Sequence, residues 1–149
     1  MTVLAAVGEE HSSAQTVSIG YDLAVKYDEE LVVLHVIPEK DFEEHKAEIE
    51  RKSHGFQDFS LSQEEESASR FSQRVVEEVL GEYEYERVKM AGRVGDPATA
   101  ILTEAESIDP RYLVIGGRQR TPIGKAVFGS VTQDILLQSE WPVVTTMRE

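Results

Sequence analysis

Residues 112–130 read YLVIGGRQRTPIGKAVFGS, and this stretch indicates the fold more clearly than any other. An apolar run at 112–115 leads into a glycine-bearing loop, and a helical pattern starts near Ser130. A strand, a glycine-rich loop and a helix N-terminus in this order bind phosphate groups in open α/β sheets. The loop also carries three cations, Arg118, Arg120 and Lys125. We therefore take residues 116–130 as the candidate binding loop.

The rest of the chain alternates between apolar runs and segments with helical periodicity. Strands are predicted at residues 2–7, 31–37, 85–91, 112–115 and 141–147. The four helices predicted between them cover about 13–27, 61–80, 97–108 and 130–139. This order predicts a Rossmann-like α/β fold with a single open, mostly parallel five-stranded sheet and helices on both faces. If the first and fourth strands are neighbours, the ligand crevice lies between residues 8–10 and 116–117.

Local signals predict how the helices begin. Three pairs have the spacing of a capping box: Ser12 with Gln15, Ser62 with Glu65, and Ser130 with Gln133. Asp96-Pro97 is typical of an N-cap followed by proline in the first helical position. The helix predicted from residue 61 has a stripe expected to be buried, formed by Ala68, Phe71, Val75 and Val79.

The length and charge of the chain limit the classes of function. Its 149 residues fit one domain, 1–149, in which the charged segment 39–60 is a variable excursion expected to be partly helical. With 28 Asp and Glu against 15 Lys and Arg, the chain does not suit nucleic acid or an anionic membrane surface as a partner. We interpret the formal net charge of −13 as a sign of salt adaptation, with an ordinary acidic cytosolic protein as the alternative.

Three further features of the sequence bear on its location and chemistry. The chain has no cysteine, which excludes disulfides and cysteine-based metal sites. The N-terminus lacks the basic start of a secretory signal, and no apolar run approaches the roughly 20 residues of a membrane helix. A cytoplasmic location is therefore predicted.

No catalytic residue is predicted. We interpret His35, at the end of an apolar strand, as a structural group with its hydrogen bonds satisfied, whereas His11 could approach the crevice. His45 and His54 lack metal-ligand spacing and are expected in solvent. The glutamates at 64–66 favour the positive end of a helix dipole. No nucleophile elbow or Walker loop is present.

At this point the residues resemble the universal stress protein family along nearly the whole chain. The likeness lies in residues 3–7, 31–38 (with His35-Val36), 95–97, 113–116 and 129–131. Nucleotide-binding members of that family carry Gly-x2-Gly-x9-Gly-Ser/Thr after the fourth strand. Here Gly116 is the first glycine, Gln119 stands in the place of the second, and Gly129-Ser130 end the motif at the right distance.

The resemblance implies a stress-response or signalling module that binds an adenine nucleotide, ATP or AMP, without significant turnover. It places Gly8 and the backbone of Val36 near the base. It places five residues around the ribose and phosphates: Gly116, Gln119, Gly129, Ser130 and Val131. From the residues themselves, Gly117 and the cations Arg118, Arg120 and Lys125 join these candidates.

Two departures from the family pattern concern the ligand. Gln119 adds a side chain where backbone would approach phosphate, and Gly117, Gly124 or a re-routed loop could compensate for it. Gly8 stands where ATP-binding members usually have Asp. One alternative is therefore a dimeric interaction module that binds no nucleotide, and a slow ATPase that uses Mg²⁺ with ATP is the least supported one.

The last strand, residues 141–147, bears on assembly. An apolar edge strand left bare is an aggregation hazard. Pairing Val143, Val144 and Thr145 with the same residues of a second copy would remove that hazard and matches the family's habit. The sequence therefore predicts a homodimer.

Overall fold

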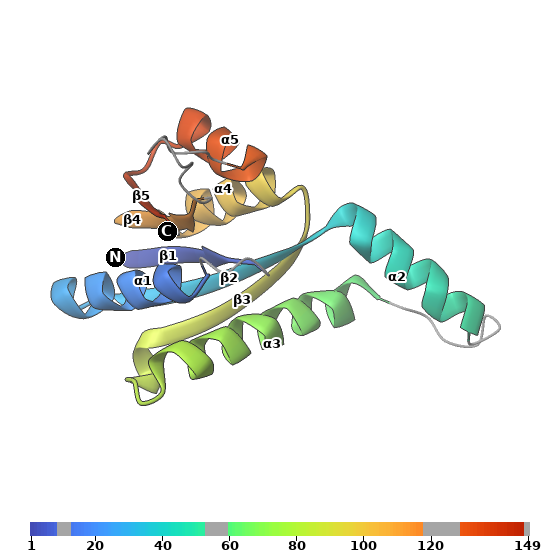
Figure 1. Ribbon diagram of the computed structural model, residues 1–149, viewed down its shortest axis with the longest axis horizontal. Coiled ribbons are helices and arrows are strands. Elements are labelled where there is room, and N and C mark those ends of the chain that lie inside the picture. Colours follow the sequence, from blue (N-terminus) through green and yellow to red (C-terminus); the bar gives the residue numbers. More distant parts are fainter. Residues whose placement is uncertain (9–12, 53–59, 118–128, 148–149) are drawn as a thin grey trace, which may run out of the picture.

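The computed structural model describes residues 1–8, 13–52, 60–117 and 129–147 (Figure 1). Its centre is a five-stranded sheet in the order β3-β2-β1-β4-β5, with every neighbouring pair parallel. The strands are β1 (Thr2–Val7), β2 (Glu30–Pro38), β3 (Val88–Gly95), β4 (Tyr112–Gly116) and β5 (Val143–Thr146). The predicted α/β fold and open parallel sheet are confirmed. The first strand pairs with the fourth, which is the condition under which the crevice was placed.

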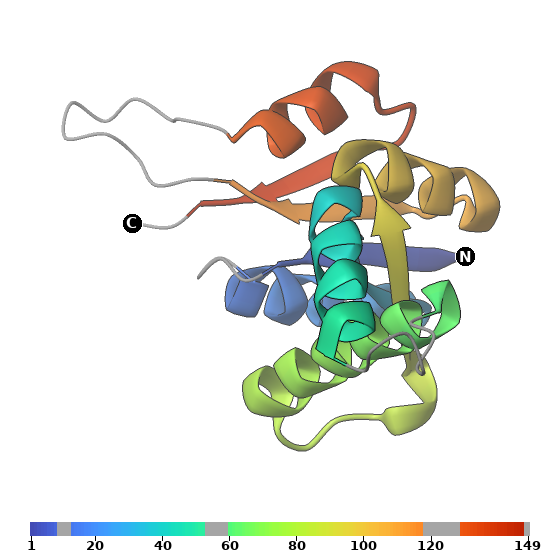
Figure 2. The same ribbon diagram turned by 90° about the vertical axis from the view of Figure 1, so that its right-hand side faces the viewer.

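Helices cover both faces of the sheet (Figures 1 and 2). Helices α1 (Ser13–Tyr27) and α3 (Leu61–Leu80) lie on one face, and α4 (Pro97–Ile108) and α5 (Ser130–Gln138) lie on the other. A short 3-10 helix, η1 (Tyr85–Arg87), precedes β3. Alternate residues of β1 and β2 enter two separate cores, because successive side chains of a strand point to opposite faces.

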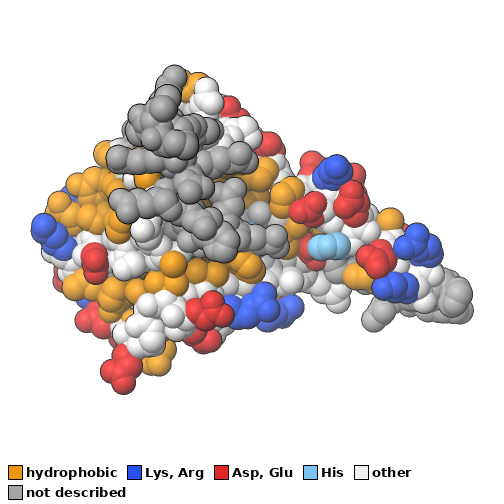
Figure 3. Space-filling model, viewed as in Figure 1, with side chains coloured by type: hydrophobic (Ala, Val, Ile, Leu, Met, Phe, Trp, Pro, Cys, Tyr) orange, Lys and Arg blue, Asp and Glu red, His pale blue; other side chains and the backbone are white. Residues whose placement is uncertain are grey.

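The described residues contain one α-helix more than the four predicted. Helix α2 (Glu39–Lys52) occupies the first part of the segment expected to be a partly helical excursion. It has no buried residue and leads away from the sheet (Figure 1), and Figure 3 shows charged side chains of both signs along it. No helix of the described segments is both long and apolar enough to cross a membrane.

The start of α3 differs from the prediction. Ser60, with extended backbone, is the N-cap and forms the capping box with Gln63, so the box predicted for Ser62 and Glu65 is wrong. Ser60 with Gln63 and Ser62 with Glu65 have the same spacing in the sequence. The first pair forms the cap, since α3 begins at Leu61 and Ser62 already lies in its first turn. Gly81 ends the helix near the predicted position.

The buried stripe of α3 is also displaced from the predicted one. It consists of Glu64, Ala68, Ser72 and Val76, while Phe71, Val75 and Val79 pack at its margin. Small residues face the sheet because α3 approaches β3 closely at Gly92, where a Cβ atom would lie 2.7 Å from Cβ of Ala68. This close approach is a tertiary feature, and helical periodicity alone favoured the larger side chains.

The third strand is an edge strand, as predicted, but it covers Val88–Gly95 instead of residues 85–91. The turn before it is fixed by Arg87, whose guanidinium donates to the carbonyl oxygen of Glu29 at 2.8 Å and to Asp28 Oδ1 at 3.1 Å. These bonds cross nearly 60 residues of sequence, so the alternation at residues 85–87 was a misleading local signal.

We expect Gly92→Ala to destabilise the protein by about 1–3 kcal/mol. The new Cβ would collide with the carbonyl oxygen of Glu65 and lie 2.5 Å from the backbone nitrogen of Ser69, and backbone atoms cannot rotate away. Urea unfolding measures the change. Gly8→Ala is the matched control, because nothing lies within 4 Å of a Cβ there and its effect should stay within about 0.5 kcal/mol. Equal stability of the two variants would contradict this packing.

Candidate functional site

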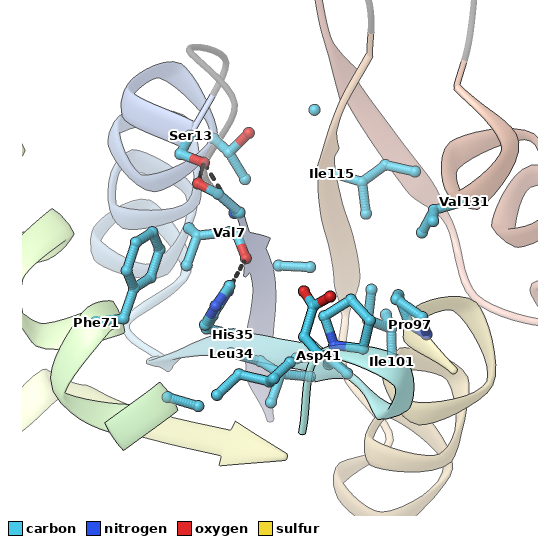
Figure 4. A pocket seen from close by; sticks show the side chains of 18 of the residues that line it. Val7, Ser13, Leu34, His35, Asp41, Phe71, Pro97, Ile101, Ile115 and Val131 are labelled. Carbon is cyan, nitrogen blue, oxygen red and sulfur yellow. Dashed lines mark hydrogen bonds between the residues drawn. The ribbon is translucent and has the colours of Figure 1, made fainter. Parts of the chain in front are cut away.

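A cavity of about 710 Å³ opens beyond the carboxyl ends of β1, β2 and β4. In a doubly wound sheet this is the place where the strand order reverses and ligands bind. One wall comes from α4, α5 and the end of β4, with Pro97, Ile101, Ile115 and Val131 (Figure 4). The opposite wall comes from α2 and α3 and carries polar and charged side chains: Asp41, His45, Glu64, Ser67 and Arg74.

The cavity brings together several of the residues singled out from the sequence. Those that line it are Gly8, Val36, Gly116, Gly129, Ser130 and Val131. Gly117 does not line it: its N–H donates to the Thr146 carbonyl oxygen at 2.6 Å, and a Cβ at this position would lie 2.5 Å from Sδ of Met147. The remaining candidates lie outside the described residues: Arg118, Gln119, Arg120 and Lys125.

Helix α5 presents its N-terminus to the cavity. Its N-cap is Gly129, so Ser130 is the first helical residue and the capping box predicted for Ser130 with Gln133 is wrong. A glycine N-cap has no side chain with which to accept from the first N–H groups, those of residues 130–132. The hydroxyl of Thr132 donates to the Gly116 carbonyl oxygen at 2.8 Å and ties this helix to the end of β4. The positive end of the helix dipole is therefore held beside the cavity.

The end of β1 is fixed by a serine that the sequence analysis did not single out. Ser13 Oγ accepts from the Gly8 N–H at 2.9 Å and donates to the Gly8 carbonyl oxygen at 2.7 Å. Both polar backbone groups of Gly8 are thereby satisfied at the first turn of α1. The cap predicted from Ser12, like the histidine at position 11, lies outside the described residues.

His35 stands on the cavity wall between the end of β1 and α3 (Figure 4). Its Nδ1 lies 2.9 Å from the Val7 carbonyl oxygen, and its ring stacks on Phe71 with centroids 4.1 Å apart. The guanidinium of Arg74 lies 5.9 Å from the Phe71 centroid on the same helix. The expected hydrogen bond of a structural histidine is present, but the imidazole also borders the cavity, which the sequence did not indicate.

A second polar contact joins α2 to α3 at the cavity. His45 Nδ1 lies 3.2 Å from Glu64 Oε1; the Glu64 side chain is only 6% exposed, while that of His45 is 56% exposed. His45 is exposed, as expected, but it also contacts Glu64, because α2 returns it to the start of α3. His54 lies outside the described residues. Among the residues that the structure describes, no group of three or more His, Asp or Glu side chains could hold a metal ion.

The wall formed by α4 depends on Asp96, which is the predicted N-cap. Its Oδ2 accepts from the Thr99 N–H at 3.1 Å and from the Thr99 hydroxyl at 2.8 Å, and Pro97 follows in the first turn. These hydrogen bonds hold the pKa of Asp96 below its ordinary value, and the bond from the Thr99 hydroxyl has the larger effect. The local signal Asp96-Pro97 was enough to predict this N-cap.

The chain resembles known proteins over nearly all of its length. The model of the Universal stress protein family matches residues 1–146. A universal stress protein of Mycolicibacterium smegmatis is 45% identical over 49 residues, which are 33% of this chain and 38% of that relative.

Solved structures share the fold. A universal stress protein from Archaeoglobus fulgidus superposes with a TM-score of 0.63 at 21% identity, covering 97% of each chain. A universal stress protein in complex with cAMP superposes with a TM-score of 0.63 at 16% identity, covering 99% of this chain and 96% of the other.

We expect Asp96→Ala to lower stability at neutral pH and the loss to shrink on acidification. Because the pKa of Asp96 is lowered in the folded state, its contribution is complete above the ordinary carboxyl pKa and disappears as the pH falls through the lowered value. Urea midpoints at a series of pH values measure both effects. Asp22→Ala, at an exposed position of α1, controls for the loss of a charge. A wild-type advantage that is independent of pH would argue against the cap.

Proposed function

The chain belongs to the universal stress protein family, and from this premise we propose that it binds an adenine nucleotide, ATP or AMP, in the cavity at the end of the sheet. We propose that it does so as a stress-response or signalling module, without significant turnover. The observation that carries the proposal is the glycine-capped N-terminus of α5, which faces the cavity beside Gly116. The cAMP complex of a protein with the same fold supports an adenine nucleotide as the ligand.

The phosphates would lie at the N-terminus of α5. Backbone N–H groups at a helix start bind anions through hydrogen bonds and the helix dipole. Ser130 and Val131 line the cavity, and the Ser130 hydroxyl adds a further donor. The loop cations at 118, 120 and 125 would contribute charge-assisted hydrogen bonds to the phosphates.

The base would lie against β2. The last residue pair between β1 and β2 joins Val7 to His35, while β2 continues to Pro38. Backbone groups of residues 36–38 on that side therefore have no partner in β1 and are available to the edge of a base. Apolar side chains of Leu34, Ile101 and Ile115 line the cavity nearby. Its volume falls within the range of about 300–1,000 Å³ found for small-molecule sites.

At Gly8 the contact to this ligand would differ from that of family members with an aspartate in this position. No atom lies within 4 Å of a Cβ at position 8, so the missing aspartate leaves room at the cavity edge.

Mg²⁺ would enter with ATP, held by its phosphates and water. We propose a cytoplasmic location, where such nucleotides are abundant, and interpret the net charge of −13 as salt adaptation. The interaction module that binds no nucleotide is the alternative.

We also propose a homodimer formed through β5. This strand is at the edge of the sheet. The carbonyl oxygens of Pro142 and Thr146 accept from N–H groups of β4 and Gly117, at 2.9 Å and 2.6 Å. Since backbone groups alternate in direction along a strand, those of Val143 and Thr145 point to the free edge. A second copy could pair with them.

A titration with ATP, ADP and AMP in high salt tests nucleotide binding, and two variants at one position test its mechanism. Ser130→Ala removes the hydroxyl and should weaken binding by about 0.5–1.5 kcal/mol. Ser130→Pro also removes the first N–H group of α5 and should weaken binding by about tenfold or more. Proline suits this first helical position, and Gly129 already has the extended conformation (φ −69°, ψ 165°) required before proline.

Calorimetry gives the affinities, and circular dichroism confirms that α5 is retained in both variants. Absence of heat at millimolar nucleotide with the wild-type protein would refute the proposal and favour the interaction module. Equal affinities of all three proteins would place the phosphates elsewhere.

The dimer is tested by Thr145→Pro. Proline removes an N–H group that points away from β4, so the sheet should remain intact while pairing with a second copy is lost. In sedimentation velocity at tens of micromolar, we expect dimers of the wild type and of Thr145→Val, which keeps the N–H group, and monomers of the proline variant. A monomeric wild-type protein would refute the dimer.

A further inference from the structure

We propose that His35 selects the base of the bound nucleotide. Its Nε2 accepts a hydrogen bond from the exocyclic amino group of a 6-aminopurine, and so disfavours a 6-oxopurine, which presents a carbonyl oxygen instead. The inference rests on the proposed function, since it concerns the same cavity.

The tautomer of His35 follows from one contact. Its Nδ1 lies 2.9 Å from the Val7 carbonyl oxygen, which can only accept a hydrogen bond. Nδ1 therefore carries a proton. In the neutral ring Nε2 is then an acceptor with a free lone pair. No residue in the described part of the chain bonds to Nε2.

The orientation of the ring is fixed on two sides. Phe71 stacks on it at 4.1 Å between centroids, and Arg74 lies against Phe71 at 5.9 Å from its centroid. A flip of the imidazole would break the bond to Val7, at the last residue pair between β1 and β2. The acceptor is therefore held in place before a ligand arrives, which is what a selective site requires.

The neighbouring charged groups favour the same kind of ligand. Four ionisable side chains share the wall with His35: Asp41 and His45 of α2, and Glu64 and Arg74 of α3. Figure 4 shows Asp41 directed into the cavity, and its carboxylate can only accept. The N-terminus of α5, on the opposite wall, supplies donors. A ligand with an anionic end and an amino-bearing end matches both walls.

A 6-oxopurine would bring its carbonyl oxygen against the lone pair of Nε2. Two acceptors that face each other leave both groups unpaired in a desolvated site. ATP and ITP test this directly, because they share ribose and triphosphate and differ only at position 6 of the purine and in the proton that ITP carries at N1. We expect the wild-type protein to bind ATP about tenfold more tightly than ITP near neutral pH.

The variant His35→Asn isolates the acceptor. An asparagine amide can donate to the Val7 carbonyl oxygen from near the Nδ1 position, but it places no atom near Nε2. The ratio of ATP to ITP affinity should fall toward one, while urea unfolding confirms the fold. Gln73→Asn is the control: it places the same amide at an exposed position of α3 that does not line the cavity, and should leave the ratio unchanged.

The outcomes separate the two proposals. Tight binding of both nucleotides with a ratio near one in the wild-type protein would overturn the role of His35 and leave the nucleotide site standing. A ratio that His35→Asn leaves unchanged would do the same. Absence of binding of either nucleotide to the wild-type protein would refute the nucleotide site itself, and the role of His35 with it.

Discussion

The parallel pairing of β1 between β2 and β4 is the constraint on which the rest of the structure depends. Its central residues Val3, Leu4 and Ala5 are fully buried, because side chains from both faces of the strand enter a core. The strand ends at Val7, while β2 continues for three residues. The cavity exists because β1 is the shorter strand at the point where the order of the sheet reverses, and Ser13 satisfies the backbone of Gly8 at that break.

The same arrangement gives the cavity two different walls. On one face, α4 begins at the local Asp96 cap, and Thr132 ties α5 to Gly116 at the end of β4, 16 residues earlier. The opposite wall comes from α3 and from α2, which leads away from the sheet and is joined to the start of α3 by His45 and Glu64. The first wall carries backbone donors and apolar side chains; the second carries acceptors and charges.

Features set by local patterns could be predicted from the sequence, and features set by packing could not. The sheet, the order of its elements and the α4 cap follow from local patterns and were predicted. Helix α5 was predicted to begin near Ser130, but its cap is Gly129 and not Ser130. The buried face of α3 was misplaced because Gly92 demands small residues opposite it, and only the packed pair of elements reveals that. His35, Glu64 and Phe71 were not recognised as cavity residues for the same reason: their positions depend on how α2 and α3 return to the sheet.

The proposed nucleotide would have to reach this cavity against the field of an acidic protein. At low ionic strength the formal charge of −13 opposes the approach of a polyphosphate. At about 1 M salt the screening length is only about 3 Å, so this long-range repulsion vanishes. Short-range bonds from the N–H groups of residues 130–132 persist, because the helix fixes their direction and they need no net charge. A site built from backbone donors therefore suits a chain with an acidic surface better than a site that depends on a basic surface would.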